Sequence, residues 1–188
     1  MGLDMYLTRK KYVGAEYKHR NVTGEAHVLI GDKELPIKFE KLSYIEESVC
    51  YWRKANQIHK WFVENVQNGI DDCKSYNVEL EDLEKLLSLC KEVKEKAILK
   101  EDKVSVGETF KDGKWEPILE DGKIIENAEE ISKILPTSSG CFFGSTSYDE
   151  FYMNDIEHTI KSLEEVLKEE EELRESGFYS EFYYQSSW

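Results

Sequence analysis

The segment YWRKANQIHKWF, residues 51–62, holds the polar side chains best suited to binding an anion. Read as a helix, it places Arg53, Asn56, Gln57 and Lys60 on one polar face, apart from an apolar stripe. Two cations and two amides suit a phosphate or a carboxylate. The pattern predicts an anion-binding surface, and an ordinary solvated helix face would show the same pattern.

A second polar segment, LPTSSGCFFGSTSYDE at residues 135–150, leads into a predicted helix. Glycine permits close approach of a ligand to the backbone, and free amides at a helix start attract anions. The segment lacks the GK[ST] of a Walker loop and the pattern GxGxxG. We expect it to meet residues 51–62 in one recess, the alternative being a structured loop without a ligand. Its candidate ligand-binding residues are Ser139, Gly140, Gly144, Ser145 and Thr146.

Catalysis has weaker support in the sequence. His59 lies on the apolar stripe of residues 51–62, where a hydrogen-bonded core histidine is more common than a general base. A hydrolase or transferase that uses His59 with Asp71, Asp72 or Cys73 is an alternative, but the sequence fixes no nucleophile–base distance. We therefore assign no catalytic residue.

The sequence predicts neither a metal site nor a cofactor. Asp155 and His158 are three positions apart, but carboxylate-bridged metal bundles need that motif twice. The four cysteines form no CxxC pair, which argues against structural zinc and favours reduced thiols in a cytoplasmic protein. These cysteines are Cys50, Cys73, Cys90 and Cys141.

The net charge of −14 is unevenly distributed, with +3 over residues 1–63 and −17 over residues 64–188. Direct binding of nucleic acid is disfavoured, because phosphate neutralisation needs clustered cations. The run 164–175 contains seven acidic and two basic residues. An acidic face of this kind could instead bind and inhibit a basic, nucleic-acid-handling partner protein.

The composition predicts a single folded domain over residues 1–188, since 40% of the residues are hydrophobic and 34% are charged. No apolar run approaches the ~18 residues of a membrane span. The start MGLDMYLTRKKY lacks the apolar stretch of a signal peptide. We expect a cytoplasmic protein without membrane contact, and the oligomeric state is left open.

Alternation of apolar and polar residues predicts the strands. Leu3, Met5 and Leu7 indicate a half-buried N-terminal strand, and residues 26–39 suggest a hairpin around Gly31. The aromatic C-terminus FYSEFYYQSSW has high β-propensity and is expected to pair with the first strand.

Three main helices are expected, at residues 46–67, 79–98 and about 147–175, the last with Ser147 as its cap. Residues 100–134 look like an inserted excursion: a small meander with turns at Asp112-Gly113 and Asp121-Gly122, then a short helix at 127–134. The predicted fold is α+β. Its three helices pack against a small, mostly antiparallel sheet made of the N-terminal strand, the 26–39 hairpin and the C-terminal strand.

Four sequence pieces resemble a family of small proteins from phages and prophage regions of bacteria. The resemblance implies no particular reaction or catalytic residue, and favours an accessory role such as interference with host defence. The leading hypothesis is therefore a non-enzymatic protein that holds a small anionic, nucleotide-like ligand. The pieces are MGLDMYL (1–7), YWRKANQIHKWFVENVQNG with DDC (51–69 and 71–73), LPTSSGCFFGSTSYDEFY (135–152) and YYQSSW (183–188).

Overall fold

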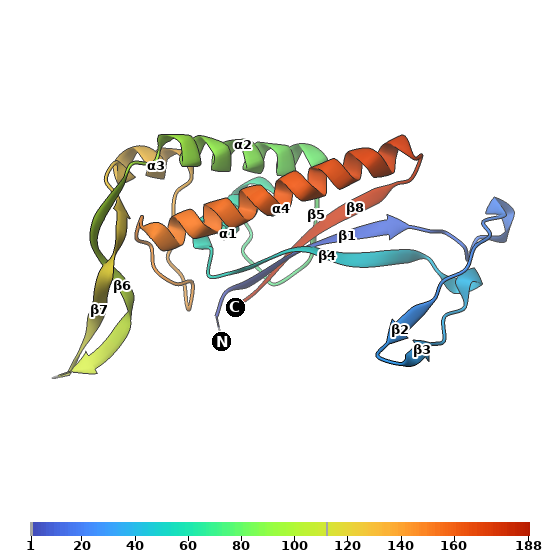
Figure 1. Cartoon of the computed structure of the whole chain (residues 1–188), viewed down its shortest axis with the longest axis horizontal. Helices are drawn as coiled ribbons and strands as arrows, with labels where there is room; N and C mark the ends of the chain where they lie inside the picture. The colour runs from blue at the N-terminus through green and yellow to red at the C-terminus, as the bar shows by residue number, and fades with distance from the viewer. Residues whose placement is uncertain (1, 112) are drawn as a thin grey trace.

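The computed structural model describes residues 2–111 and 113–188, and its central element is a four-stranded antiparallel sheet (Figure 1). The strand order is β4 (Tyr44–Arg53), β1 (Asp4–Tyr12), β8 (Ser180–Ser187) and β5 (Tyr76–Val78). β1 therefore lies between β4 and β8, and its alternation reflects burial of one face, with Met5, Leu7 and Arg9 buried. The predicted pairing of the N-terminal and C-terminal strands is confirmed.

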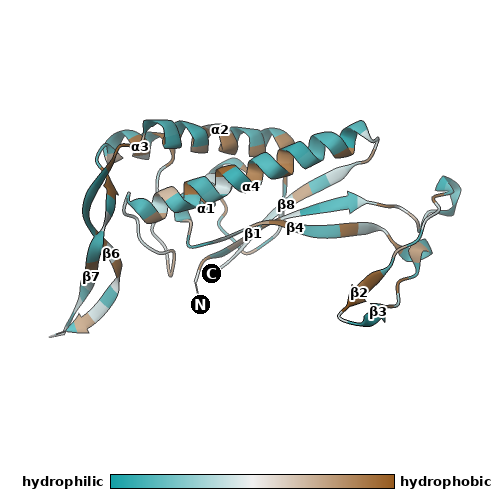
Figure 2. Ribbon diagram, in the orientation of Figure 1, coloured by the Kyte–Doolittle hydropathy of each residue, from teal (hydrophilic) through white to brown (hydrophobic). Residues whose placement is uncertain are grey.

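One face of the sheet is covered by helices. α2 (Leu80–Lys96) and α4 (Glu150–Glu175) lie side by side over it, and α1 (Asn56–Asn65) follows β4 directly (Figure 1). The apolar stripes of α2 and α4 turn inward, and their outer faces are polar (Figure 2). No helix among the described residues is long and apolar enough to cross a membrane. The core stripe comprises Leu83, Leu86, Cys90 and Val93 of α2 and Ile156, Ile160 and Leu163 of α4.

Two hairpins project from opposite ends of the molecule (Figure 1). β2 (Val28–Ile30) pairs with β3 (Lys33–Leu35), flanked by short 3-10 turns at Lys18–Arg20 and Phe39–Lys41. The longer ribbon pairs β6 (Leu99–Lys111) with β7 (Lys114–Ile125) and leads into α3 (Ala128–Ile134).

The predicted arrangement of three helices against one small sheet is wrong. The 26–39 hairpin forms, with Gly31 in the left-handed region at its turn, but it is a separate two-stranded sheet whose residues are all exposed. The described chain contains four α-helices and eight strands, and the strands form three separate sheets. Alternation predicted the hairpin, but because both of its faces are solvated, nothing in the pattern placed it on the core.

The predicted helix at 46–67 is also wrong in its first half. Residues Tyr44–Arg53 form β4, and the helix begins only at Asn56. Pairing with β1 explains the difference, because a bulge between Leu7 and Thr8 shifts the register. The extra residue at the bulge breaks the strict alternation of apolar and polar residues. The apolar residues of this strand therefore have a spacing that also suits a helix.

The region 100–134 is a ribbon and a helix rather than a meander. Asp121 and Gly122 lie inside β7, opposite Lys103 and Asp102, because β7 runs unbroken to Ile125. Gly113 adopts a left-handed conformation at the tip of the ribbon, and Asp112 lies outside the described residues. The short helix is confirmed as α3.

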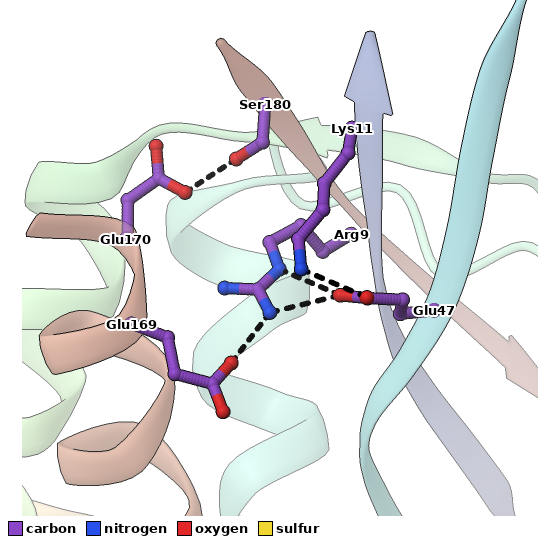
Figure 3. A network of polar contacts seen from close by, with 6 residues as sticks. All are labelled: Arg9, Lys11, Glu47, Glu169, Glu170 and Ser180. Atoms are coloured by element: carbon purple, nitrogen blue, oxygen red, sulfur yellow. Dashed lines mark hydrogen bonds and ion pairs between the residues drawn. The ribbon is translucent and has the colours of Figure 1, made fainter. Parts of the chain in front are cut away.

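A buried arginine ties the sheet to α4 (Figure 3). Arg9 of β1 is 2% exposed, and its guanidinium donates to Glu47 of β4 and to Glu169 of α4. Lys11 also donates to Glu47, at 2.8 Å. The ion pairs compensate the cost of burying the guanidinium, and they fix α4 relative to β1 and β4.

The β2–β3 arm should be dispensable for folding. Val13 N donates to Ser43 O at 3.0 Å, so the chain already closes at the base of the arm. Replacing residues 16–41 by a turn of about four glycine-rich residues should change the free energy of unfolding by no more than about 1 kcal/mol, because the arm buries no core residue. Urea unfolding followed by tryptophan fluorescence measures this. A variant that no longer unfolds cooperatively would show that the arm supports the core.

Candidate functional site

A cavity of about 700 Å³ opens where the end of β4, the first turns of α4, the loop before α4 and the β6–β7 ribbon meet. This volume is within the range of small-molecule sites. The ribbon supplies one wall, so the excursion predicted at 100–134 contributes to the site. The lining residues are Arg53, Lys54, Gln57, Ser105, Val106, Gly107, Glu108, Phe142, Gly144, Ser145, Ser147, Asp149, Phe151, Tyr152, Asn154 and Asp155.

The structure brings the two predicted binding segments together at this cavity. Arg53 and Gln57 line it from one side, and Gly144 and Ser145 line it from the other. The backbone of Leu3 joins the two segments, since its N–H donates to Phe142 O at 3.3 Å and its carbonyl accepts from Lys54 N at 2.7 Å.

Five of the predicted ligand-binding residues do not line the cavity. Lys60 pairs with Glu64 at 3.7 Å on α1. Arg53 precedes the helix, so the four side chains that were expected on one helix face do not share it. The predicted residues outside the lining are Asn56, Lys60, Ser139, Gly140 and Thr146.

Asn56 is a structural clamp. Its side chain is 1% exposed, and its Nδ2 donates to Phe143 O at 3.2 Å and to Ser145 O at 2.8 Å. Its Oδ1 accepts from Ser138 N at 2.9 Å. One buried amide therefore fixes the loop before α4 at three backbone atoms.

Strained backbone is concentrated at the cavity. Four non-glycine residues in the described chain have positive φ, and two of them, Asn21 and Asn68, are of a type that tolerates it. The other two, Lys54 (φ 62°) and Phe142 (φ 63°), both line the cavity. Left-handed conformations of such residues cost of order 1–3 kcal/mol and occur preferentially at functional sites.

The charges of the cavity are separated by depth. The exposed lining residues Arg53 and Lys54, which we call the rim, are cationic. Gln57 and Asp149 are 2% and 3% exposed, and with the partly buried Asp155 they form what we call the floor. Burial raises the pKa of Asp155 to about 6, and the hydrogen bond from Gln57 counteracts this rise only in part.

The amides at the start of α4 are already occupied. The cap is Asp149 rather than the predicted Ser147, and its Oδ1 accepts from Phe151 N at 3.0 Å and Tyr152 N at 3.2 Å. The helix begins at Glu150, because a carboxylate directly before the first turn satisfies its amides. An anion in the cavity would therefore be held by the rim side chains.

His59 is a structural residue. Its ring is 1% exposed, with Nδ1 2.8 Å from Tyr184 Oη and Nε2 3.2 Å from Asp71 Oδ1. Burial lowers its pKa, and the nearby Asp71 carboxylate opposes this effect. Asp72 pairs with Lys74, and Cys73 is exposed. The geometry therefore supports a core role for His59 rather than a base acting on Cys73.

A second cysteine–histidine contact is also unsuited to catalysis. Cys50 Sγ lies 3.7 Å from His158 Nε2, but this nitrogen is 2.9 Å from Tyr51 O. A carbonyl only accepts, so Nε2 carries the hydrogen and cannot take a proton from the thiol. Burial raises the pKa of Cys50 to about 11.

The acidic run 164–175 lies on α4, and four of its glutamates are paired with cations. These pairs reduce the charge available for a basic partner, so the geometry does not favour the inhibitor hypothesis. The pairs are Lys91–Glu164, Arg9–Glu169, Arg174–Glu170 and Lys168–Glu172.

Sequence reasoning missed several lining residues. Lys54 stood inside the predicted segment but off the supposed polar face, and Phe142 was not considered a ligand contact. Asp149 stood inside the predicted segment 135–150 but was not named as a ligand contact, and Asp155 was considered only with His158 as part of a metal motif. The ribbon residues 105–108 carried no signal, because their contribution comes only from the tertiary position of the ribbon.

Replacing Asn56 by alanine should destabilise the protein by about 2–3 kcal/mol, because three backbone groups lose their partner in a largely buried position. Chemical unfolding measures this cost. The matched control is Asn65→Ala on the same helix, whose exposed side chain donates once, to Trp61 O. Its effect should stay below about 1 kcal/mol, and equal costs for the two variants would argue against a clamp.

The carboxyl of Asp155 should titrate with a pKa of about 6 in the protein without ligand. Replacing Gln57 by alanine should raise this pKa further, since the hydrogen bond that stabilises the carboxylate is lost. Carboxyl ¹³C chemical shifts measured against pH report both values. A titration near the ordinary value of an aspartate would show that the floor is solvated.

Comparisons with known proteins do not extend this description. The chain matches no protein-family model, no curated protein and no solved structure. Within the described ranges, no group of three or more His, Cys, Asp or Glu side chains has the arrangement of a metal site. The functional argument therefore rests on the cavity.

Proposed function

We propose that the protein binds a small nucleotide-like anion in the cavity between Arg53 and the 142–147 loop, without transforming it. The observation that carries this proposal is the pair of left-handed residues, Lys54 and Phe142, on opposite segments of one lining. Strain of this kind persists only where the surrounding structure enforces it. Here it sets a cation and an aromatic ring at the same opening.

The cations of the rim suit a phosphate group. Arg53 is 61% exposed, and its Nε is 3.9 Å from Asp4 Oδ1, a separation that leaves the guanidinium available to a second anion. Lys54 makes no ion pair within 4 Å in the part of the chain that the structure describes, although Gly144 packs against its stem. An arginine fork beside a mobile ammonium is a common way to hold phosphate.

The apolar part of the lining suits a planar ring. Phe142 is 58% exposed and Phe151 is 45% exposed, although both are large apolar side chains. Exposed aromatic residues beside cations are a frequent platform for a base. The next residue, Phe143, is instead buried against His59 and Trp188, so only one ring of the pair Phe142–Phe143 remains at the cavity.

Binding is favoured over catalysis, because the rings of His59 and His158 are both committed to structural contacts. The resemblance to phage and prophage proteins supports the biological setting that we propose: an accessory protein in the bacterial cytoplasm. Sequestration of a small anionic ligand would counter a host defence that depends on that ligand. The acidic surface, at net −14, would keep such a protein away from nucleic acid.

Isothermal titration with nucleoside monophosphates should give saturable binding. Arg53→Ala and Lys54→Ala should each weaken it about tenfold, the size of one lost charge-assisted hydrogen bond. Lys60→Ala is the matched control, because this cation comes from the same sequence segment and lies outside the cavity. No heat with any nucleotide, or equal effects of all three variants, would contradict the proposal.

A further inference from the structure

The floor of the cavity presents mainly hydrogen-bond acceptors. Gln57 Nε2 donates to Asp155 Oδ2 at 3.0 Å, and this is the one hydrogen bond of the Gln57 side chain between described residues. The Gln57 carbonyl oxygen and Asp155 Oδ1 are therefore two acceptors that no described side chain or backbone amide uses. Oδ1 of the buried Asp149 already accepts from the first amides of α4, so its Oδ2 is the further acceptor of the floor.

An acceptor-rich floor determines which end of a ligand can enter. Acceptors removed from water without a donor lose their hydration at a free-energy cost, so the inner end of the ligand must supply N–H groups. Its outer end must be anionic to meet Arg53 and Lys54. Its middle must be flat and apolar to contact Phe142 and Phe151.

Among the common nucleobases, guanine meets the inner requirement. Its Watson–Crick edge has two adjacent donors, N1–H and the N2 amino group. Adenine and cytosine place a ring acceptor beside their amino group, and uracil places one N–H between two carbonyls. A ring acceptor or a carbonyl would face the floor acceptors without a hydrogen atom between them.

We propose that the ligand of the cavity is a guanine nucleotide, with its N1–H and N2 amino group donating to Asp155 and Gln57. This inference rests on the proposed function and specifies its ligand. Asp155 and Gln57 determine specificity, and Arg53 and Lys54 hold the phosphate. Flanking aromatic contact and an edge read by side chains are the usual means of recognising an unpaired base.

The test compares GMP, IMP and AMP by titration with the full chain at pH 7.5, where the Asp155 carboxyl is ionised. IMP differs from GMP only by the missing N2 amino group. GMP should bind about tenfold more tightly than IMP and about 10- to 100-fold more tightly than AMP, in line with discrimination by one bidentate edge contact. Asp155→Asn should remove most of the preference for GMP over AMP.

The matched control is Glu157→Gln, the same carboxylate-to-amide change on an exposed α4 residue that pairs with Lys94 outside the cavity. It should leave the preference unchanged. Equal binding of the three nucleotides, or a preference for AMP, would overturn the guanine inference while the proposed function stands. If none of the nucleotides binds, the proposed function itself fails.

Discussion

The site depends on one buried amide. Asn56, at the first turn of α1, binds three backbone atoms of the loop that precedes α4, and no other described side chain spans these two segments with three hydrogen bonds. This clamp holds Gly144 against Lys54 and keeps Phe142 in its left-handed conformation next to the opening. These buried hydrogen bonds, worth about 0.5–1.5 kcal/mol each, oppose a strain of order 1–3 kcal/mol per left-handed residue. The shape of the cavity therefore follows from a buried amide next to its cationic rim, since Asn56 N also donates to Lys54 O at 2.8 Å.

Elements with a one-sided burial pattern were predictable from the sequence. The stripes of α2 and α4 and the alternation of β1 each have a single hydrophobic face, and the structure confirms them. β4 was not predictable, because the bulge opposite Leu7 displaces Cys50 from strict alternation and leaves spacing that suits a helix. The β2–β3 arm has no buried face at all, so its sequence contains no information about where it lies.

The candidate site was likewise only partly predictable from the sequence. Charged and glycine residues in two unusual segments were enough to predict that Arg53, Gln57, Gly144 and Ser145 share a cavity. Asn56 is an amide of the same chemical type as Gln57, yet it serves the fold while Gln57 remains at the floor. Asn56 and Gln57 are adjacent on a helix that starts later than its apolar pattern indicates. The apolar periodicity of the sequence therefore does not show which of the two side chains faces the cavity.

The overall charge of the protein bears on the size of the anion that the cavity can bind. At a net charge of −14 the acidic surface repels anions, but salt screens charges that lie more than a Debye length, about 10 Å, from the ligand. A small ligand reaches Arg53 and Lys54 at close range, where their field outweighs the distant carboxylates. A polyanion would bring further phosphates against the acidic surface and lose more than the rim provides. Two cations in an acidic protein therefore favour a mononucleotide, the ligand that we propose, over a nucleic acid chain.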